Sequence, residues 1–259
     1  MKSTVDLVEQ ALSRWTEAKA MPIDPELLNL LKTGFFGNYQ LFTEQIFVII
    51  DHAAAAYHYV SENFSGITGY SLDVMYREGL RFVMPLIHPD DLEAFNTISE
   101  LLTQKASTLD AAELTNCRLS YDVRMAFADN TWHRMLQHNI PLTLDTSNRI
   151  VHALAILTDI TPYKTGNYCS YQLAKYSDRE RIILLEGVIG NNRQTLPEIT
   201  KRERQVIELT ARGLKESEVA AQMRIGIQTV KTYKKNLFRK TGCKNAAELV
   251  RFGVANLLL

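Results

Sequence analysis

The middle of the chain is strand-like at both ends and helical between them. Apolar and alternating runs predict five strands, at residues 46–50, 57–60, 117–128, 131–144 and 149–157. The longest helix between them runs from His88 to about Lys105, with Pro89 in its first turn. Two strands, a helical middle and three antiparallel strands predict an α+β domain with a five-stranded antiparallel sheet. Two further helices precede it, at Thr4 to Lys19 and Pro25 to Leu31.

The end of the chain has the apolar spacing of helices. Thr200 and Glu203 form a capping-box pattern that begins the first of four predicted helices, and Gly213 suits its end. The second helix runs from about residue 217 to 223, the third from 227 to 240 and the fourth from 245. Short helices separated by three-residue breaks predict an all-α domain with a helix-turn-helix.

The third of these helices has two different faces. Val230, Tyr233 and Leu237 recur at steps of three and four, which predicts packing against the second helix. The opposite face carries Gln228, Lys231, Thr232, Lys235 and Arg239. A solvated helix face usually has acidic residues among its lysines. The absence of acidic residues from this face favours contact with phosphates and base edges.

Charge is unevenly divided along the 259 residues. Overall, 29 basic side chains balance 29 acidic ones, but residues 197–259 hold 13 basic and 6 acidic, a net +7 that leaves −7 before them. This basic module indicates a polyanionic ligand.

Composition excludes several classes of protein. With 46% hydrophobic residues the chain is not a disordered regulator, and three cysteines are too few for a disulfide-built secreted module. The sequence predicts neither a membrane span nor a signal peptide, and we expect a reduced, cytoplasmic protein.

The basic module resembles the four-helix LuxR-type (GerE/FixJ-like) DNA-binding domain, over about residues 196–259. The residues that carry the likeness are Ile199 to Arg204, Gly213, Leu214, Glu218 to Ala220, Thr229 to Lys231, Asn236, Lys240, Gly242 and Ala247 to Val250. The chain departs from the family pattern at Lys215, Gly226 and Tyr233, where Ser, Ser and His are usual.

The LuxR resemblance implies that the helix from Ile227 enters the major groove of double-stranded DNA. Its expected base-contacting residues are Lys231, Thr232 and Lys235. Its expected phosphate-contacting residues are Thr229, Tyr233, Arg239 and Lys240. Packing at the edge of the core is an equal alternative for Tyr233.

The strand-rich part resembles the PAS sensor fold over residues 36–163. The likeness is carried by Tyr59 to Phe64, Gly66 to Tyr70, His88 to Leu92, Trp132 and Asp159 to Thr161. Residues 1–35 are then N-terminal helices. Residues 164–195 form a linker, with an added hairpin favoured over a signalling helix and a hinge at 190–195.

No cofactor is identifiable, although PAS domains of this kind can hold an unknown small molecule. Seven large side chains could line a cavity or fill a core: Met75, Phe82, Met84, Phe95, Met125, Trp132 and Met135. Asn116 to Arg118 repeats the letters of a flavin photosensor motif, but at the start of a strand. His88 is expected to cap a helix, and a phosphoacceptor role for Asp51 is disfavoured.

These features predict a bacterial PAS and LuxR-type transcription regulator that acts as a homodimer, with RNA polymerase as a further candidate partner. Two alternatives remain: the PAS domain is a dimerisation scaffold without ligand, or the chain recognises promoters as a sigma factor does. An enzyme is not expected, because the sequence has no nucleophile elbow, no phosphate-binding glycine loop and no histidines at metal-ligand spacing.

Overall fold

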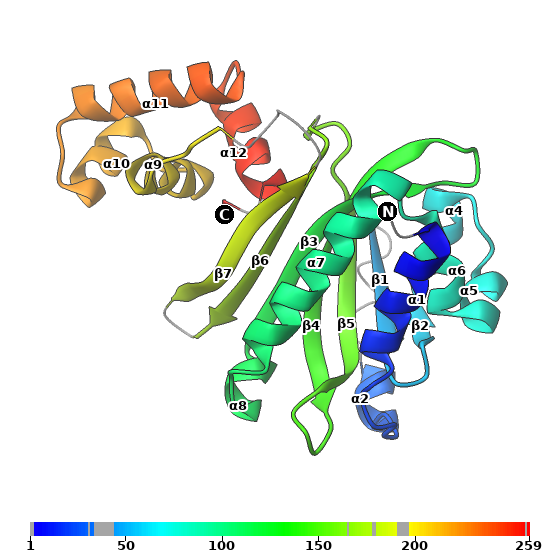
Figure 1. Cartoon of the computed structure of the whole chain (residues 1–259). Coiled ribbons are helices and arrows are strands. Elements are labelled where there is room, and N and C mark those ends of the chain that lie inside the picture. Colours follow the sequence, from blue (N-terminus) through cyan, green and yellow to red (C-terminus); the bar gives the residue numbers. More distant parts are fainter. Residues whose placement is uncertain are drawn as a thin grey trace. The chain divides into compact units, whose positions relative to one another are not determined.

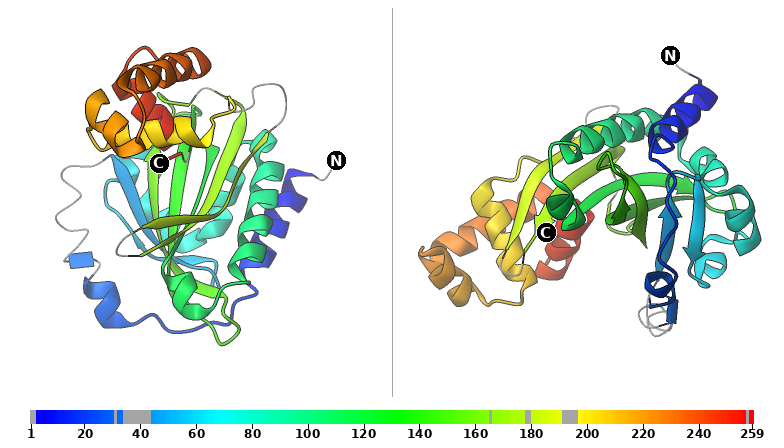
Figure 2. Two further views of the ribbon diagram at one scale, coloured as in Figure 1. Left: turned by 90° about the vertical axis from the view of Figure 1, so that its left-hand side faces the viewer. Right: turned by 90° about the horizontal axis from the view of Figure 1, so that it is seen from below.

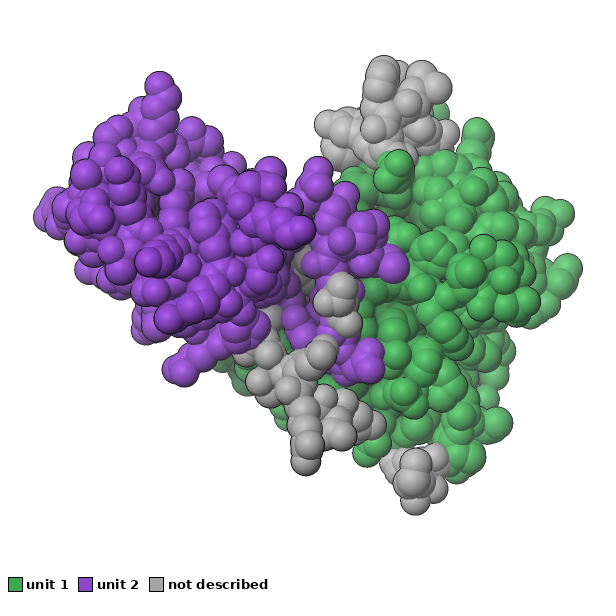
Figure 3. Space-filling model, turned by 90° about the horizontal axis from the view of Figure 1, so that it is seen from above, with its two compact units in different colours: residues 1–159, 169–191 green, residues 160–168, 192–259 purple. Residues whose placement is uncertain are grey.

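The chain folds into two units. The computed structural model describes residues 3–30, 32–33, 44–164, 166–177, 180–190, 197–256 and 258–259 (Figure 1). Residues 1–159 with 169–191 form the first unit, and residues 160–168 with 192–259 form the second (Figure 3). We call them the sensor unit and the output unit, after the roles that the sequence resemblances imply.

The sensor unit is built on one antiparallel sheet. Its strands are β1 (Gln45–Asp51), β2 (Ala56–Val60), β3 (Cys117–Ala126), β4 (Trp132–Leu144), β5 (Ile150–Asp159), β6 (Tyr168–Tyr176) and β7 (Arg181–Gly190). They follow the spatial order β2-β1-β5-β4-β3-β6-β7. The five predicted strands are present, and Asn130 and Asn148 adopt positive φ in the turns between the long strands. The predicted PAS-like α+β fold is therefore confirmed.

The sheet has seven strands rather than the predicted five. The extra pair, β6 and β7, comes from the segment at 164–195, where the sequence favoured a hairpin over a helix. β6 pairs with β3, with Tyr121 opposite Tyr171, so the hairpin extends the sensor sheet. Most of the predicted hinge, residues 191–195, lies outside the described residues.

Helices of the sensor unit fill the chain before β1 and between β2 and β3. They are α1 (Thr4–Trp15), α2 (Pro25–Asn29), α4 (Phe64–Thr68), α5 (Leu72–Glu78), α6 (Leu80–Val83), the 3₁₀ turn η2 (Met84–Leu86), α7 (Pro89–Ala106) and α8 (Ala111–Thr115). α7 runs across one face of the sheet, with α1 beside it (Figures 1 and 2). Val8 and Leu12 of α1 and Phe95 of α7 are buried in the main sensor core.

An ion pair between Asp91 and Arg124 attaches the start of α7 to β3. The Arg124 guanidinium donates to both carboxylate oxygens of Asp91, at 2.6 Å to Oδ1, and the Arg124 backbone N–H donates to Oδ2 at 2.8 Å. Burial works to raise the pKa of Asp91, but these bonds from Arg124 outweigh it and lower that pKa. His88 caps the helix as predicted, because its Nδ1 accepts the Asp90 N–H.

The two faces of the sheet carry different apolar clusters. Ile46, Val48 and Ile50 of β1 belong to the main core beneath the helices. Phe47 and Ile49 belong to a smaller cluster with Tyr59 and Leu154, against which Ile23 and Leu28 pack. Alternation along β1 produces this division, because successive side chains of a strand point to opposite faces.

The output unit contains the four predicted helices. They are α9 (Lys201–Ala211), α10 (Glu216–Met223), α11 (Ile227–Thr241) and α12 (Ala246–Ala255), and each begins within about one residue of its predicted start. Thr200 and Glu203 form the predicted capping box, and Gly213 and Gly242 take positive φ after α9 and α11. Their buried side chains form one core.

Glu203 also joins two helices of the output unit. The Lys240 ammonium of α11 donates to Glu203 Oε2 at 2.8 Å and to the Glu198 carbonyl at 2.8 Å. Burial works to raise the pKa of Glu203, but the hydrogen bonds from Lys240 and Thr200 lower it by more. The net shift of this pKa is therefore downward.

A buried charge network joins three strands of the sensor sheet. Asp122 on β3 is fully buried, and its Oδ1 accepts from Arg134 Nη1 of β4 at 2.7 Å. Its Oδ2 accepts the Ser170 backbone N–H of β6 at 2.9 Å. Both oxygens of this carboxylate therefore have charged or backbone donors in neighbouring strands.

Replacing Asp122 should strongly destabilise the sensor unit. Asp122→Ala leaves the Arg134 guanidinium buried without its anion, and we expect the free energy of unfolding to fall by about 3–5 kcal/mol. Urea unfolding of the full chain measures the loss. Glu9→Ala removes one partner of an exposed pair, 3.5 Å from Arg81, and should cost about 0–1 kcal/mol. Equal losses for the two variants would contradict the assignment.

Glu203→Gln should weaken the output unit in a pH-dependent way. We expect a loss of about 1.5–3 kcal/mol near neutral pH, measured by hydrogen exchange of α9 amides in the full chain. The folded pKa lies below the ordinary value of 4.5. The stabilisation is therefore complete above that ordinary pKa and disappears as the pH falls through the lowered one.

The control for this prediction is Glu208→Gln. Glu208 lies 3.8 Å from Arg204 on the same helix and is more exposed, so its replacement should change little. A Glu203→Gln effect that is small, or constant down to the acid transition, would show that the pair with Lys240 is not stabilising.

Candidate nucleic-acid interface and sensor cavity

One face of α11 packs on the output core and the other is exposed. Val230 and Leu237 are fully buried. Gln228, Lys231, Thr232, Lys235 and Arg239 are all exposed, as the helical spacing predicted. Within the fifteen residues of α11 there is no Asp or Glu. We call these five exposed residues the cationic face.

Tertiary contacts sort the five basic residues of α11 into two groups. Lys240 is paired with Glu203, and the Lys234 ammonium lies 3.5 Å from Glu216 on α10. Within the described part of the chain, Lys231, Lys235 and Arg239 make no ion pair. Three positive charges are thus left on the cationic face, because their helix neighbours are basic, polar or apolar.

The predicted DNA-contacting residues all lie on α11, but they differ in accessibility. Lys231, Thr232 and Lys235, expected at base edges, are exposed, and so are Thr229 and Arg239, expected at phosphates. The Thr232 hydroxyl donates to the Gln228 carbonyl within the helix.

Tyr233 and Lys240 are less available than the other predicted contacts. Tyr233 is half-buried and packs against the output core, the alternative that the sequence left open. Lys240 already has two acceptors within the unit. Their predicted phosphate contacts would be made from side chains that already have structural partners.

The last helix keeps most of its apolar side chains inside the output unit. Leu249 and Leu258 are buried, and Phe252 packs against the same core. Val254 is the large apolar side chain of α12 that remains 47% exposed. In the described part of this segment, apolar surface available to a second copy of the chain is therefore centred on Val254.

The sensor unit contains a large cavity on the helix-covered side of its sheet. Its volume is about 530 Å³. Pockets for small molecules usually measure about 300–1,000 Å³. Apolar side chains from β1, β4 and β5 form one wall, including Ile50, Met135 and Ala153, and Trp15 of α1 lines it too.

Uncharged polar groups also line this cavity. Tyr57, Tyr121, Gln137 and Asn139 all contribute to its wall. Burial raises the pKa of both tyrosines well above the usual range, so both phenols stay neutral near physiological pH. The Gln137 amide donates to Asn139 Oδ1 at 2.7 Å.

Charged groups at the cavity are already engaged. Arg149 donates to the Glu17 carbonyl at 2.6 Å and lies 3.5 Å from the Glu17 carboxylate. Arg14 donates to the Asn96 carbonyl at 3.0 Å. The cavity therefore offers apolar surface and neutral hydrogen-bonding groups.

Only part of the predicted cavity set lines the cavity. Met75, Met84, Met125 and Met135 do, whereas Phe82, Phe95 and Trp132 do not. Trp132 is 43% exposed. The sequence analysis missed the polar lining, because Gln137 and Asn139 lie in a short polar stretch of β4 whose spacing does not show that they face a cavity.

The flavin-like motif lies outside the cavity lining. Cys117 is buried and its thiol donates to the Glu113 carbonyl.

His133 contacts Asp159 at 2.6 Å, and His138 contacts Ser120 at 2.7 Å. Both histidines therefore have side-chain partners within the sensor unit. Burial, with Arg118 and Arg181 nearby, lowers the pKa of His138 to about 3.

Within the described residues, no helix combines the length and the hydropathy that crossing a lipid bilayer requires.

Two solved structures are similar over part or most of the chain. One is a Vibrio cholerae VqmA dimer, at TM-score 0.32 and 16% identity, covering 91% of this chain and 89% of that one. The other is the N-terminal domain of a Marinobacter aquaeolei diguanylate cyclase with a PAS/PAC sensor, at TM-score 0.36 and 14% identity, covering 46% and 97%. The PAS-like assignment of the sensor unit rests on its own strand order.

Comparison with known sequences identifies the output unit. Residues 197–253 match the model of the luxR family of bacterial regulatory proteins. The probable transcriptional regulator ycf29 of Cyanophora paradoxa is 32% identical over 123 residues, 39% of this chain and 57% of that protein. The Escherichia coli transcriptional regulatory protein UhpA is 43% identical over 53 residues, 20% and 27%. The chain thus spans about a quarter to just over half of these relatives, and its residues 197–253 are a DNA-binding domain of the type found in the luxR family of bacterial regulatory proteins.

Proposed function

We propose that the chain is a DNA-binding transcription regulator whose sensor unit responds to a small uncharged ligand. The observation that carries the proposal is the cationic face of α11, in a luxR-family domain, with three cations that have no carboxylate partner in the described part of the chain. Duplex DNA is a polyanion with acceptors on its major-groove edges, and it satisfies such a face.

In this proposal α11 lies in the major groove. Lys231 and Lys235 donate to base acceptors, and the Thr232 methyl contacts a thymine methyl. Arg239 and Thr229 bind phosphates and set the register of the helix on the duplex. Lys240 attaches α11 to α9 through Glu203 and so fixes the helix that carries the cationic face.

The proposed active form is a homodimer. One recognition helix reads only a few base pairs, and two output units on half-sites one helical turn apart double the contacts. The exposed Val254 gives α12 an apolar contact point for a second copy. RNA polymerase is the partner through which a bound regulator of this kind would act.

The cavity favours ligand sensing over a purely scaffolding role. A volume of about 530 Å³ accommodates a molecule the size of a small heterocycle or metabolite. Neutral Tyr57 and Tyr121 can each donate a hydrogen bond, and the amides of Gln137 and Asn139 can donate or accept. An uncharged ligand with a few polar atoms suits this lining.

Lys235→Ala should weaken DNA binding and its salt dependence. On random duplex DNA, the slope of log affinity against log salt should fall by about 0.9 for each cation lost from the interface. On a specific site, a lost base contact should cost about 1–3 kcal/mol. Fluorescence anisotropy with the full chain, at several salt concentrations, measures both.

Lys19→Ala is the matched control for this experiment. It removes one exposed positive charge from the sensor unit and leaves α11 unchanged. Affinity and slope should then stay close to those of the wild type. If Lys235→Ala behaves like Lys19→Ala, the cationic face does not bind DNA and the proposal fails.

Filling the cavity should abolish ligand binding. Ala153 is buried in the cavity wall, and Ala153→Phe adds a ring to that space. We expect wild-type protein purified from cells to retain one small uncharged molecule per chain, identified by mass spectrometry after denaturation. The Ala153→Phe protein should retain none, while circular dichroism shows that it is folded.

Ala112→Phe places the same ring on the exposed surface of α8 and serves as the control. This variant should retain the molecule as the wild type does. Repeated absence of any molecule from the wild type, with unchanged DNA binding by Ala153→Phe, would support the scaffold alternative instead.

A further inference from the structure

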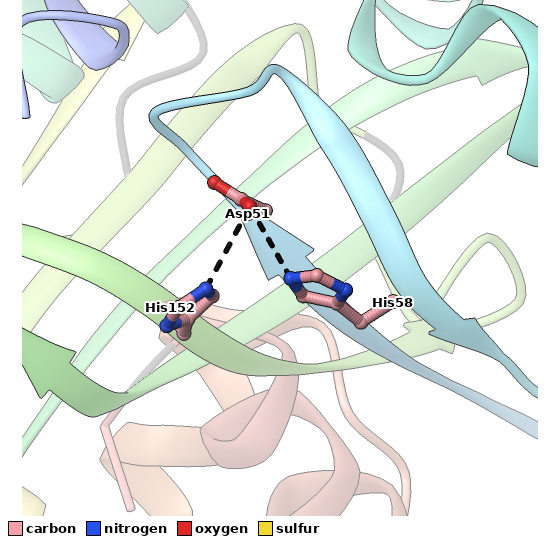
Figure 4. Close-up of side chains that lie close together, drawn as sticks. All are labelled: Asp51, His58 and His152. Atoms are coloured by element: carbon pink, nitrogen blue, oxygen red, sulfur yellow. Dashed lines mark ion pairs between the residues drawn. The ribbon is translucent and has the colours of Figure 1, made fainter. Parts of the chain in front are cut away.

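Two histidines and an aspartate that are far apart in the sequence meet on the sensor sheet. Asp51 ends β1, His58 lies in β2, and His152 lies in β5 (Figure 4). They lie on the face that carries Ile49 and Leu154, opposite the cavity. We call these three residues the His–Asp cluster.

A regular cross-strand pair and a bulge in the sheet bring the cluster together. Asp51 and His152 are direct cross-strand partners and share a face. In β2 the pairing passes from Tyr59 to Tyr57, so His58 is an extra residue in a bulge. A bulge re-aims a side chain that regular alternation would direct elsewhere, and here it places His58 beside Asp51.

The distances within the cluster fit a small metal ion. Asp51 Oδ2 lies 3.2 Å from His58 Nε2 and 3.6 Å from His152 Nε2, and all three ligand atoms lie within 4.8 Å of one another. Two ligands about 2.0–2.1 Å from a tetrahedral Zn²⁺ lie about 3.3–3.4 Å apart. The two distances from Asp51 Oδ2 to the histidine nitrogens are within a few tenths of an ångström of that separation.

The cluster also has the supporting contacts that metal ligands require. Thr143 Oγ1 lies 2.6 Å from His152 Nδ1, and a second register shift, in β4, brings Thr143 opposite His152. When Nδ1 carries the proton toward Thr143, the lone pair of Nε2 points into the cluster. Asp51 Oδ1 accepts the Ala54 N–H at 2.9 Å, which leaves Oδ2 as the ligand atom.

Both Nε2 atoms are otherwise without a hydrogen bond. Within the described residues, the Nε2 atoms of His58 and His152 are buried and have the Asp51 carboxylate as their polar neighbour, with no further hydrogen-bond partner. The side chain of His152 as a whole is fully buried. A cation bound between them would give both buried nitrogens a partner for their lone pairs and would balance the charge of the Asp51 carboxylate.

We propose that Asp51, His58 and His152 form a binding site for one divalent transition-metal ion, with Zn²⁺ as the best match. Two imidazoles and one carboxylate supply three ligands, and water or a small molecule supplies the fourth. The ion would join β1, β2 and β5. Ile50 and Ala153, the neighbours of two of its ligands, line the cavity on the opposite face.

The site can be tested on the full chain after treatment with a chelator. We expect wild-type protein to bind one Zn²⁺ per chain by calorimetry, to raise its Tm by several degrees with saturating Zn²⁺, and to show visible absorption bands with Co²⁺. His58→Ala and His152→Ala should each lose all three signals. His58 is about one-third exposed, so His58→Ala should fold even if His152→Ala does not.

Two further variants separate the site from adventitious binding. Thr143→Val removes the hydroxyl that contacts His152 and should weaken Zn²⁺ affinity about 10–100-fold. Thr143→Ser keeps a hydroxyl at this position and should bind Zn²⁺ with an affinity close to that of the wild type. His133→Ala removes a histidine that also pairs with an aspartate, outside the cluster, and should bind as the wild type does. Absence of stoichiometric binding, or equal binding by wild type and His58→Ala, would overturn the proposal.

Discussion

The buried carboxylate of Asp122 connects three strands of the sensor sheet. A charge without access to water needs donors on both oxygens, and Arg134 of β4 and a backbone N–H of β6 supply them. One of those donors belongs to the hairpin, so β6 has to pair with β3 for the carboxylate to be satisfied. The chain between the PAS-like strands and the output unit therefore continues the sheet.

That continuous sheet separates two chemically different environments. On the helix-covered face, apolar residues of β1, β4 and β5 and neutral tyrosines surround a cavity of about 530 Å³. On the other face, Asp51 and His152 stand on the same two strands, one residue along from the cavity-lining Ile50 and Ala153. Alternation along a strand places the two sites back to back, with only the thickness of the sheet between them.

In the output unit, pairing decides which charges remain available for a partner. All five basic residues of α11 look alike in the sequence, yet Lys234 and Lys240 are matched with glutamates of α10 and α9. These two cations stabilise the contacts of α11 with its neighbours. Lys231, Lys235 and Arg239 are left on the exposed side, where a polyanion can approach them.

Much of this architecture is local and could be predicted from the sequence. The local signals act within a few residues: capping residues such as Thr200 and Asn245, the glycines with positive φ after α9 and α11, and the alternation of β3 to β5. The helices, the strands and the exposed face of α11 could therefore be predicted from residue spacing alone. The long-range contacts could not. The pairing of the β6–β7 hairpin with β3, the polar lining of the cavity and the meeting of His58 with His152 depend on strand register and bulges. The pairing of Lys240 with Glu203 depends on how α11 packs against α9. Register joins residues about a hundred positions apart, and no local pattern in the sequence records it.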